Sequence, residues 1–183
     1  MIIDFSQHTQ PQINFAHVYQ AGEIDLEDEI AQVTGPMEVK GNARRINSSS
    51  NSATATVKGN LSGRIELACS RCLQPVETNF ETTFDVDYVT LGEYEQVGGE
   101  TNAEHGLTNA DFSVSVYDGE RIDLDELTRE QILLNLPARQ LCQENCAGLC
   151  EKCGTNKNIN HCSCETEEID PRWNALKEFK SNN

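Results

Sequence analysis

Apolar and polar residues alternate along two stretches in the first half of the chain. From residue 55 to residue 69 the apolar side chains share one parity, and polar or charged side chains take the other. The same alternation recurs from residue 76 to residue 88. A period of two is typical of strands with one buried face. The two stretches are joined by Cys69-Ser70-Arg71-Cys72-Leu73-Gln74-Pro75, so the pattern predicts a β-hairpin with cysteines at its tip.

Weaker signals predict the neighbouring elements. Residues 37–46 are predicted as a strand that precedes a loop rich in serine and asparagine at 47–52. Residues 89–111 are rich in glycine, glutamate and asparagine without periodicity, which indicates an exposed acidic loop. Alternation at 112–116 then predicts a short strand.

The clearest helix signal covers residues 123–136. Asp123 can cap its first turn, and Glu126 stands three residues later, as in a capping box. The expected apolar positions are Leu124, Leu127, Ile132 and Leu134. We expect Pro137 to end this helix. A second, short helix is expected after Asp170-Pro171.

Together these elements predict an α+β fold: an antiparallel β-sheet or partial barrel with one main helix and a metal-binding, cysteine-rich C-terminal segment. We expect a β-rich core in residues 1–137, containing the acidic loop 89–111 and the helix 123–136. Residues 138–183 are expected to form a zinc-knuckle-like tail and the short terminal helix. Six cysteines and few large apolar side chains lie in 138–169, so metal would have to replace a hydrophobic core there.

The composition indicates a soluble protein with a modest core. The chain has 183 residues, of which 37% are hydrophobic and 24% charged. No stretch approaches the roughly 18 consecutive apolar residues of a membrane span. The first twenty residues lack the basic and apolar regions of a secretory signal. We therefore expect a cytoplasmic, acidic protein without membrane contact.

The charge is distributed unevenly along the chain. The formal net charge is −16, yet residues 38–72 carry +4, between −6 over 1–37 and −13 over 73–138. The basic stripe indicates either a solvated sheet face or a face that contacts phosphates. In the second case the candidate contacts are Arg44, Arg45, Arg64 and Arg71.

The tail cysteines predict a metal site. They are Cys142, Cys146, Cys150, Cys153, Cys162 and Cys164. A C-x-x-C turn such as Cys150/Cys153 presents two sulfurs to one ion, and Gly154 permits the positive φ that such a turn often needs. Zinc is favoured because all-thiolate structural sites are its usual environment, although iron also accepts these ligands. His161 is a further candidate ligand, but a plain surface histidine is the simpler interpretation.

The pair Cys69/Cys72 is less specific. Its spacing suits a metal, a redox dithiol or no function. A redox pair favours a helix N-terminus, where the dipole lowers the thiol pKa, and this pair is predicted in a hairpin turn instead. Eight thiolates divide into two four-coordinate sites, and one grouping places Cys69 and Cys72 with two tail cysteines. We expect one or two bound ions.

No catalytic constellation emerges. The serines lack a matching His/Asp frame, there is no glycine-rich phosphate loop, and the carboxylates fall in solvated runs. We therefore expect a protein that is not an enzyme and takes no small-molecule substrate.

Several motifs occur together in this chain: Leu124-Asp125-Glu126-Leu127, Glu130 to Pro137, Cys146-Ala147-Gly148-Leu149-Cys150, Cys162-Ser163-Cys164, Ile169-Asp170-Pro171-Arg172-Trp173 and the C-x-R-C segment at Cys69. They resemble the YceD family of large ribosomal RNA subunit accumulation proteins, over residues 36–180. The resemblance implies a bacterial, non-enzymatic factor that supports the accumulation or assembly of large-subunit (23S) ribosomal RNA.

The resemblance and the charge pattern together suggest two partners. The basic stripe would place Arg44, Arg45, Arg64 and Arg71 in an RNA-binding face, and the acidic segments would suit a basic ribosomal protein. One alternative is a redox-sensing thiol protein that uses Cys69/Cys72. Another is a zinc-dependent hydrolase, which would need an open coordination position and a general base that the sequence does not reveal.

Overall fold

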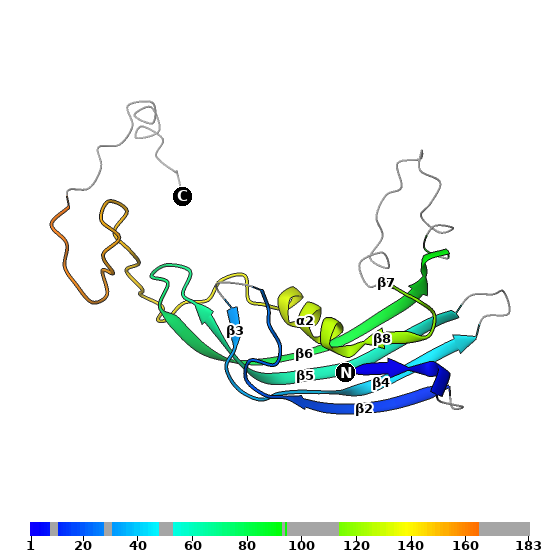
Figure 1. Cartoon of the computed structure of the whole chain (residues 1–183). Coiled ribbons are helices and arrows are strands. Elements are labelled where there is room, and N and C mark those ends of the chain that lie inside the picture. Colours follow the sequence, from blue (N-terminus) through cyan, green and yellow to red (C-terminus); the bar gives the residue numbers. More distant parts are fainter. Residues whose placement is uncertain (8–10, 28–30, 48–52, 93, 95–113, 165–183) are drawn as a thin grey trace, which may run out of the picture.

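The computed structural model describes residues 1–7, 11–27, 31–47, 53–92, 94 and 114–164. Its elements are β1 (Ile2–Asp4), the 3-10 helix η1 (Phe5–Gln7), β2 (Gln12–Tyr19), β3 (Ala31–Val33), β4 (Met37–Asn47), β5 (Ala53–Ala68), β6 (Pro75–Thr90), β7 (Val114–Tyr117), β8 (Arg121–Asp123) and α2 (Leu124–Leu134). One long sheet has the order β2-β4-β5-β6-β7, with β3 paired to the end of β5. Figure 1 shows that this sheet curves around α2.

The predicted hairpin is confirmed. β5 and β6 pair antiparallel along almost their whole length. Leu61 and Ile65 on β5 are fully buried, whereas Lys58 and Arg64 on the other parity are exposed. The period of two therefore separates a core face from a solvent face, as the alternation predicts. The strand expected at 37–46 is also confirmed, as β4.

The sheet is mixed rather than purely antiparallel, which corrects one detail of the predicted fold. β7 pairs with β6 in parallel. Parallel neighbours need a crossover of a dozen or more residues, and residues 91–113 between the two strands supply that length. The remaining pairs of the long sheet are antiparallel.

Two glycines face each other in the middle of the sheet because the neighbouring backbone and two aromatic rings leave no room for side chains. Gly41 on β4 pairs with Gly59 on β5. A Cβ at Gly59 would lie 2.6 Å from Cζ of Phe84. One at Gly41 would lie 2.1 Å from the carbonyl oxygen of Lys58 and 2.9 Å from Cζ of Phe15. Both phenylalanines are buried in the core. The missing side chains thus let the rings pack directly on the backbone.

Helix α2 covers the core face of the sheet and begins where the sequence predicts. The carboxylate of Asp123 accepts a hydrogen bond from the backbone N–H of Asp125 and so caps the first turn. The helix ends at Leu134 instead of residue 136. Leu134 is 74% exposed, while Gln131 is buried, so the apolar assignment of position 134 was wrong: it lies off the stripe that begins at Leu124.

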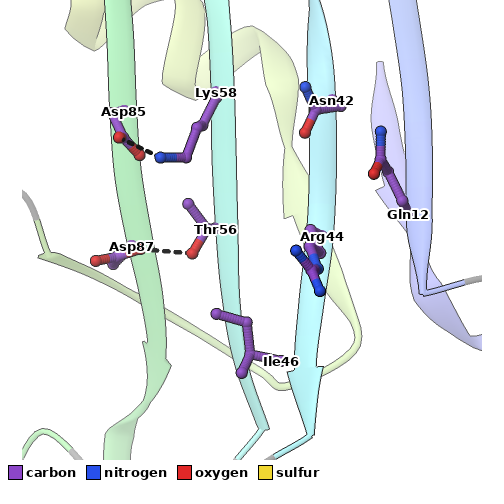
Figure 2. Close-up of a pocket in the computed structure, with 8 residues that line it drawn as sticks. All are labelled: Gln12, Asn42, Arg44, Ile46, Thr56, Lys58, Asp85 and Asp87. Atoms are coloured by element: carbon purple, nitrogen blue, oxygen red, sulfur yellow. Dashed lines mark hydrogen bonds and ion pairs between the residues drawn. The ribbon is translucent and has the colours of Figure 1, made fainter.

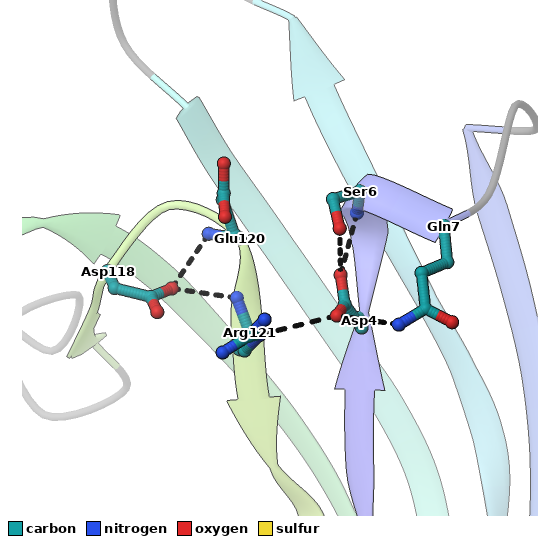
Figure 3. Close-up of polar contacts among 6 residues, drawn as sticks. All are labelled: Asp4, Ser6, Gln7, Asp118, Glu120 and Arg121. Carbon is teal, nitrogen blue, oxygen red and sulfur yellow. Dashed lines mark hydrogen bonds and ion pairs between the residues drawn. The ribbon is translucent and has the colours of Figure 1, made fainter.

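A separate two-stranded ribbon of β1 and β8 is held by the carboxylate of Asp4. Figure 3 shows this carboxylate accepting hydrogen bonds from Ser6, Gln7 and Arg121. Chiefly through the Ser6 hydroxyl, these contacts lower the pKa of Asp4 to about 2. The bond between Arg121 and Asp4 therefore joins β8 to β1 at the exposed end of the ribbon.

No element before residue 37 is predicted from the sequence, yet β1, β2 and β3 lie there. β2 pairs with β4 along its whole length. Its alternation is present in Ile13, Phe15 and Tyr19, but the polar His17 occupies the same parity and weakens the signal. His17 is tolerated because its ring packs edge-on against Tyr19, with centroids 4.4 Å apart.

Three expectations lie outside the described residues: most of the acidic loop 89–111, Phe112 of the expected strand, and the short helix after Asp170. Residues 89 and 90 belong to β6. Within the described part of the chain, no helix is long and apolar enough to cross a membrane.

Candidate metal centres

The structure brings the eight cysteines together in two groups of four. The first cluster consists of Cys69, Cys72, Cys142 and Cys146, and the second cluster of Cys150, Cys153, Cys162 and Cys164. Within each cluster all sulfur atoms lie within 4.8 Å of one another. This is the grouping in which the hairpin pair joins two tail cysteines.

The sulfur spacing of the first cluster fits a tetrahedral ion. Sγ of Cys69 lies 3.8 Å from Sγ of Cys146, and Sγ of Cys72 lies 3.6 Å from Sγ of Cys142. Four Zn–S bonds of about 2.3 Å in a tetrahedron place the sulfurs about 3.8 Å apart. Two sulfur pairs therefore stand at the spacing that a zinc ion would require, and all four sulfurs lie within 4.8 Å of one another.

The hairpin turn presents the first two sulfurs. The backbone N–H of Leu73 donates to the carbonyl of Cys69, and the N–H of Cys69 donates to the carbonyl of Gln74, both at 2.9 Å. Leu73 has φ 58°, a left-handed conformation that a leucine rarely adopts. The tight turn that brings Cys72 back beside Cys69 thus carries backbone strain, as functional turns often do.

The tail is fastened to the hairpin tip by Arg71. Its Nη1 donates to the carbonyl of Cys146 at 2.8 Å, and its own carbonyl accepts from Leu149 at 3.1 Å. Gly148 passes so close that a Cβ there would lie 3.1 Å from the Arg71 carbonyl oxygen, and its φ of 73° also favours glycine. The first cluster is therefore surrounded by direct contacts between the hairpin and the tail.

The second cluster is a local knuckle. The N–H of Gly154 donates to the carbonyl of Cys150 at 2.8 Å. Gly154 has φ 70°, which confirms the positive φ expected of it. Of the four cysteines only Cys150 is buried, and Cys153 and Cys164 are exposed. This cluster thus closes a short loop near solvent.

Backbone amides favour the ionised form of one thiol in each cluster. Desolvation opposes ionisation of Cys69, but the N–H groups of Arg71, Cys142 and Cys72 outweigh it and lower the pKa to about 6. The N–H groups of Cys153 and Lys152 lower the pKa of Cys150 to about 6. Amides aimed at sulfur are the surroundings in which thiolates bind metal.

Other thiols in the same clusters are held protonated by their neighbours. Desolvation and the adjacent thiols raise the pKa of Cys142 to about 12, and the thiols of Cys153 and Cys150 raise that of Cys164 to about 12. Four thiolates crowd too closely to ionise together without a compensating cation. The donor set therefore fits a bound divalent metal ion.

Asn158 connects the two clusters. It lies in the loop between Cys153 and Cys162, yet its Nδ2 donates to Sγ of Cys146 at 3.3 Å. Its Oδ1 accepts from the N–H of Ala147 at 2.8 Å. A hydrogen bond to a ligating sulfur tunes and orients it. The role of Asn158 is not predictable from the sequence, because an asparagine among polar residues carries no signal. His161, by contrast, is exposed and belongs to neither cluster.

The four arginines proposed as phosphate contacts do not share one face. Arg44 and Arg45 are adjacent on β4, so they point to opposite sides of the sheet. Nη2 of Arg45 donates to the carbonyl of Gly119 at 2.8 Å, and Arg71 is engaged with Cys146 as described. Arg44 and Arg64 are exposed and make no hydrogen bond or ion pair with the described residues.

The sheet face opposite α2, here called the outer face, mixes both charges. Its basic residues on β4 and β5 are Lys40, Arg44, Lys58 and Arg64, and its acidic residues on β6 are Glu77, Glu81, Asp85 and Asp87. Figure 2 shows Lys58 bonded to Asp85 and Thr56 bonded to Asp87, both at 2.6 Å, in a hollow that Arg44 also lines. Glu38, which pairs with Lys40 at 3.9 Å, and Glu66 also lie on this face of β4 and β5, so the basic stripe is a mixed column beside an acidic one.

In the described residues, the protein is a curved β-sheet covered by helix α2, with two clusters of four cysteines at one end. The family model described as Large ribosomal RNA subunit accumulation protein YceD matches residues 57–180. That match spans both the hairpin and the tail that build the clusters. The chain belongs to the YceD family.

Relatives with curated sequences include uncharacterised proteins of mycobacteria. The chain is 32% identical to one from Mycobacterium tuberculosis over 111 residues, which is 61% of this chain and 48% of that protein. It is 28% identical to one from Mycobacterium leprae over 123 residues, 67% of this chain and 52% of that protein. The chain spans about half the length of these relatives.

A plant relative carries a functional name. The chain is 34% identical over 55 residues, 30% of this chain and 17% of the relative, to the chloroplastic large ribosomal RNA subunit accumulation protein YCED homolog 1 of Arabidopsis thaliana. No solved structure matches the chain.

Proposed function

We propose that each cysteine cluster binds one zinc ion and that both ions are structural. Each cluster supplies four sulfurs, so a tetrahedral ion would have no open position for water or substrate. Zinc is preferred over iron because single ions with four thiolates are its common structural site. A catalytic zinc needs that open position and a general base, so the donor sets favour a protein that is not an enzyme.

We propose further that this chain is a non-enzymatic, cytoplasmic factor that supports the accumulation or assembly of large-subunit ribosomal RNA. The observation that carries this proposal is the family match over residues 57–180. The charge distribution supports direct contact with pre-ribosomal RNA, a basic ribosomal protein, or both.

For the RNA contact we assign Arg44 and Arg64 on the outer face, with Lys40 as a further point charge. Both arginines are exposed and uncommitted within the described residues, and guanidinium groups bind phosphate bidentately. Arg45 and Arg71 donate hydrogen bonds to backbone carbonyls instead. We therefore assign them a role in maintaining the fold.

The test begins in cells. The protein is crosslinked, and the RNA and proteins recovered with it are identified; recovery of large-subunit RNA or large-subunit ribosomal proteins is expected. Recovery of neither, with efficient crosslinking of the protein to other partners, would contradict the proposal.

The RNA face is tested with purified protein. Binding of Arg44→Gln/Arg64→Gln to large-subunit RNA is measured across salt concentrations, beside the charge-matched control Arg129→Gln/Arg139→Gln, whose residues lie outside the outer face. The salt slope should fall by about one to two units in the first variant only. Equal slopes in both variants would remove the outer face from RNA binding.

The redox alternative predicts a different chemistry for Cys69 and Cys72. The lowered pKa of Cys69 favours it, but both side chains are almost completely buried, whereas redox-sensing thiols are accessible. Thiol titration of the zinc-loaded protein distinguishes the two. Protected thiols with bound zinc support the structural role, and a rapidly oxidised Cys69/Cys72 pair supports the redox role.

A further inference from the structure

A cleft of about 360 Å³ lies on the α2 side of the sheet, away from both cysteine clusters. It is bounded by the end of β6, by β7 and β8, and by the first turns of α2. Four carboxylates line it: Asp118, Asp123, Glu126 and Glu130. The single basic residue among the described lining residues is Arg121, whose Nε is engaged with Asp4 (Figure 3). The cleft is therefore strongly acidic.

Two of these carboxylates have no partner within the described residues. Asp118 accepts the N–H groups of Glu120 and Arg121, and Asp123 caps α2. Glu126 and Glu130 make no hydrogen bond or ion pair there, although they stand one helical turn apart on α2. Like charges at this spacing destabilise a helix. A bound cation would relieve that repulsion.

The nearly buried Tyr88 also presents to this cleft a hydroxyl without a hydrogen-bond partner among the described residues. The side chain of Tyr88 is only 6% exposed, and its hydroxyl makes no hydrogen bond within the described part of the chain. The hydroxyl is not among the fully buried unpartnered atoms of the described residues, so it is open to the cleft and can be reached by a ligand. Burial, with the charges of Glu130 and Glu126, raises the pKa of Tyr88, so the hydroxyl stays neutral. Its ring packs against Tyr117, with centroids 5.9 Å apart.

We propose that this cleft binds an arginine side chain of a basic protein partner. A guanidinium group offers five N–H donors, which can serve the Glu126 and Glu130 carboxylates and the Tyr88 hydroxyl together. The inference rests on the proposed function, because it names a surface for the basic ribosomal protein suggested there.

Other occupants fit less well. Phosphate is repelled by the four carboxylates, so RNA is not expected here. A metal ion needs converging oxygen ligands, and Glu126 and Glu130 are in neither of the ligand groups found among the described residues. The volume is at the low end of the range for ligand pockets, which suits one side chain.

The experiment uses the full, zinc-loaded chain and a peptide probe of four arginines separated by glycine and serine. Binding is measured by calorimetry, and the same peptide with citrulline in place of arginine serves as the uncharged probe. Glu126→Gln/Glu130→Gln should weaken binding of the arginine peptide by on the order of tenfold, and Tyr88→Phe by a few-fold. The control Glu77→Gln/Glu81→Gln, on the outer face, should change binding less than about twofold.

Three results would overturn the proposal: equal losses in the control, equal binding of the citrulline peptide, or tighter peptide binding after deletion of residues 165–183. The last result would show that Arg172, Lys177 or Lys180 of this chain occupies the cleft. The glutamine variant should melt no lower than the parent, since it removes a repulsion. Peptide binding is independent of the crosslinking test above, so failure of the cleft and failure of the proposed function are distinguishable.

Discussion

The two cysteine clusters each contain four cysteines, but the first brings together residues that lie much farther apart in the sequence than those of the second. The first joins a hairpin turn to the tail, and its Cys69 and Cys146 are 77 positions apart. The second lies wholly within residues 150–164. Three cysteines of the first cluster are buried, against one of the second. A cross-link that closes a long loop restricts the unfolded chain more than one that closes a short loop.

The two clusters of four cysteines also differ in their surroundings. In the first cluster, Val76, Leu141 and Leu149 pack around the cysteines and form a small core that is separate from the main one. The second cluster has no comparable apolar shell among the described residues. The first therefore fixes where the tail lies on the sheet, and the second shapes the tail itself.

The largest expected effect comes from removing each cluster in turn. Cys69→Ser/Cys146→Ser should release residues 138–149 from the hairpin, because zinc supplies ~10–16 kcal/mol of folding free energy in small zinc domains. Cys153→Ser/Cys164→Ser should release only residues 150–164. Amide hydrogen exchange measured by mass spectrometry distinguishes the two patterns. If the second variant frees 138–149 as fully as the first, the clusters do not differ as described.

A smaller loss of tail docking is expected from Arg71→Met, which keeps the apolar stem and removes the guanidinium group. The lost bond to the Cys146 carbonyl is partly exposed to solvent, so it should contribute about 1 kcal/mol. Amide protection in 140–149 should fall about fivefold. Arg64→Met, with no such contact, is the matched control. Unchanged protection in Arg71→Met would mean that the cluster alone holds the tail.

How much of this comparison is predictable from sequence depends on the range of each interaction. The hairpin and the start of α2 follow from local patterns: strict alternation around Leu61 and a capping aspartate at position 123. The grouping of the cysteines does not follow from local patterns. Spacing alone allows Cys142 and Cys146 to share a site either with the hairpin pair or with the later tail cysteines. The contacts of Arg45 and Arg71 could not be predicted for a related reason, since their partners lie more than 70 positions away in the sequence.

A weaker coupling between the clusters is expected through Asn158. Asn158→Ala removes its bonds to Cys146 and Ala147, which should cost about 1 kcal/mol in the stability of the first cluster. Zinc release from the first cluster to a chelator should accelerate a few-fold. Asn160→Ala, in the same loop, is the control. Identical release rates in both variants would show that the two clusters are independent.

The smallest expected effect is on the pH dependence of unfolding, and it concerns the β1–β8 ribbon rather than the clusters. The pKa of Asp4 is lowered to about 2 from an ordinary value of 3.8. Its carboxylate therefore stabilises the fold above about pH 4, and this contribution is lost as the pH falls through about 2. Asp4→Asn should reduce the dependence of unfolding on pH in that window. Hydrogen exchange in 140–164 at pH 7 should not change; a change there would couple the β1–β8 ribbon to the clusters.

The number of zinc ions that the chain binds can be measured by native mass spectrometry. The full chain should carry two zinc ions, and Cys69→Ser/Cys72→Ser and Cys162→Ser/Cys164→Ser should each carry one. One ion in the full chain that survives the loss of Cys69 and Cys72 would contradict the account, because the hairpin pair would then have no ligand role.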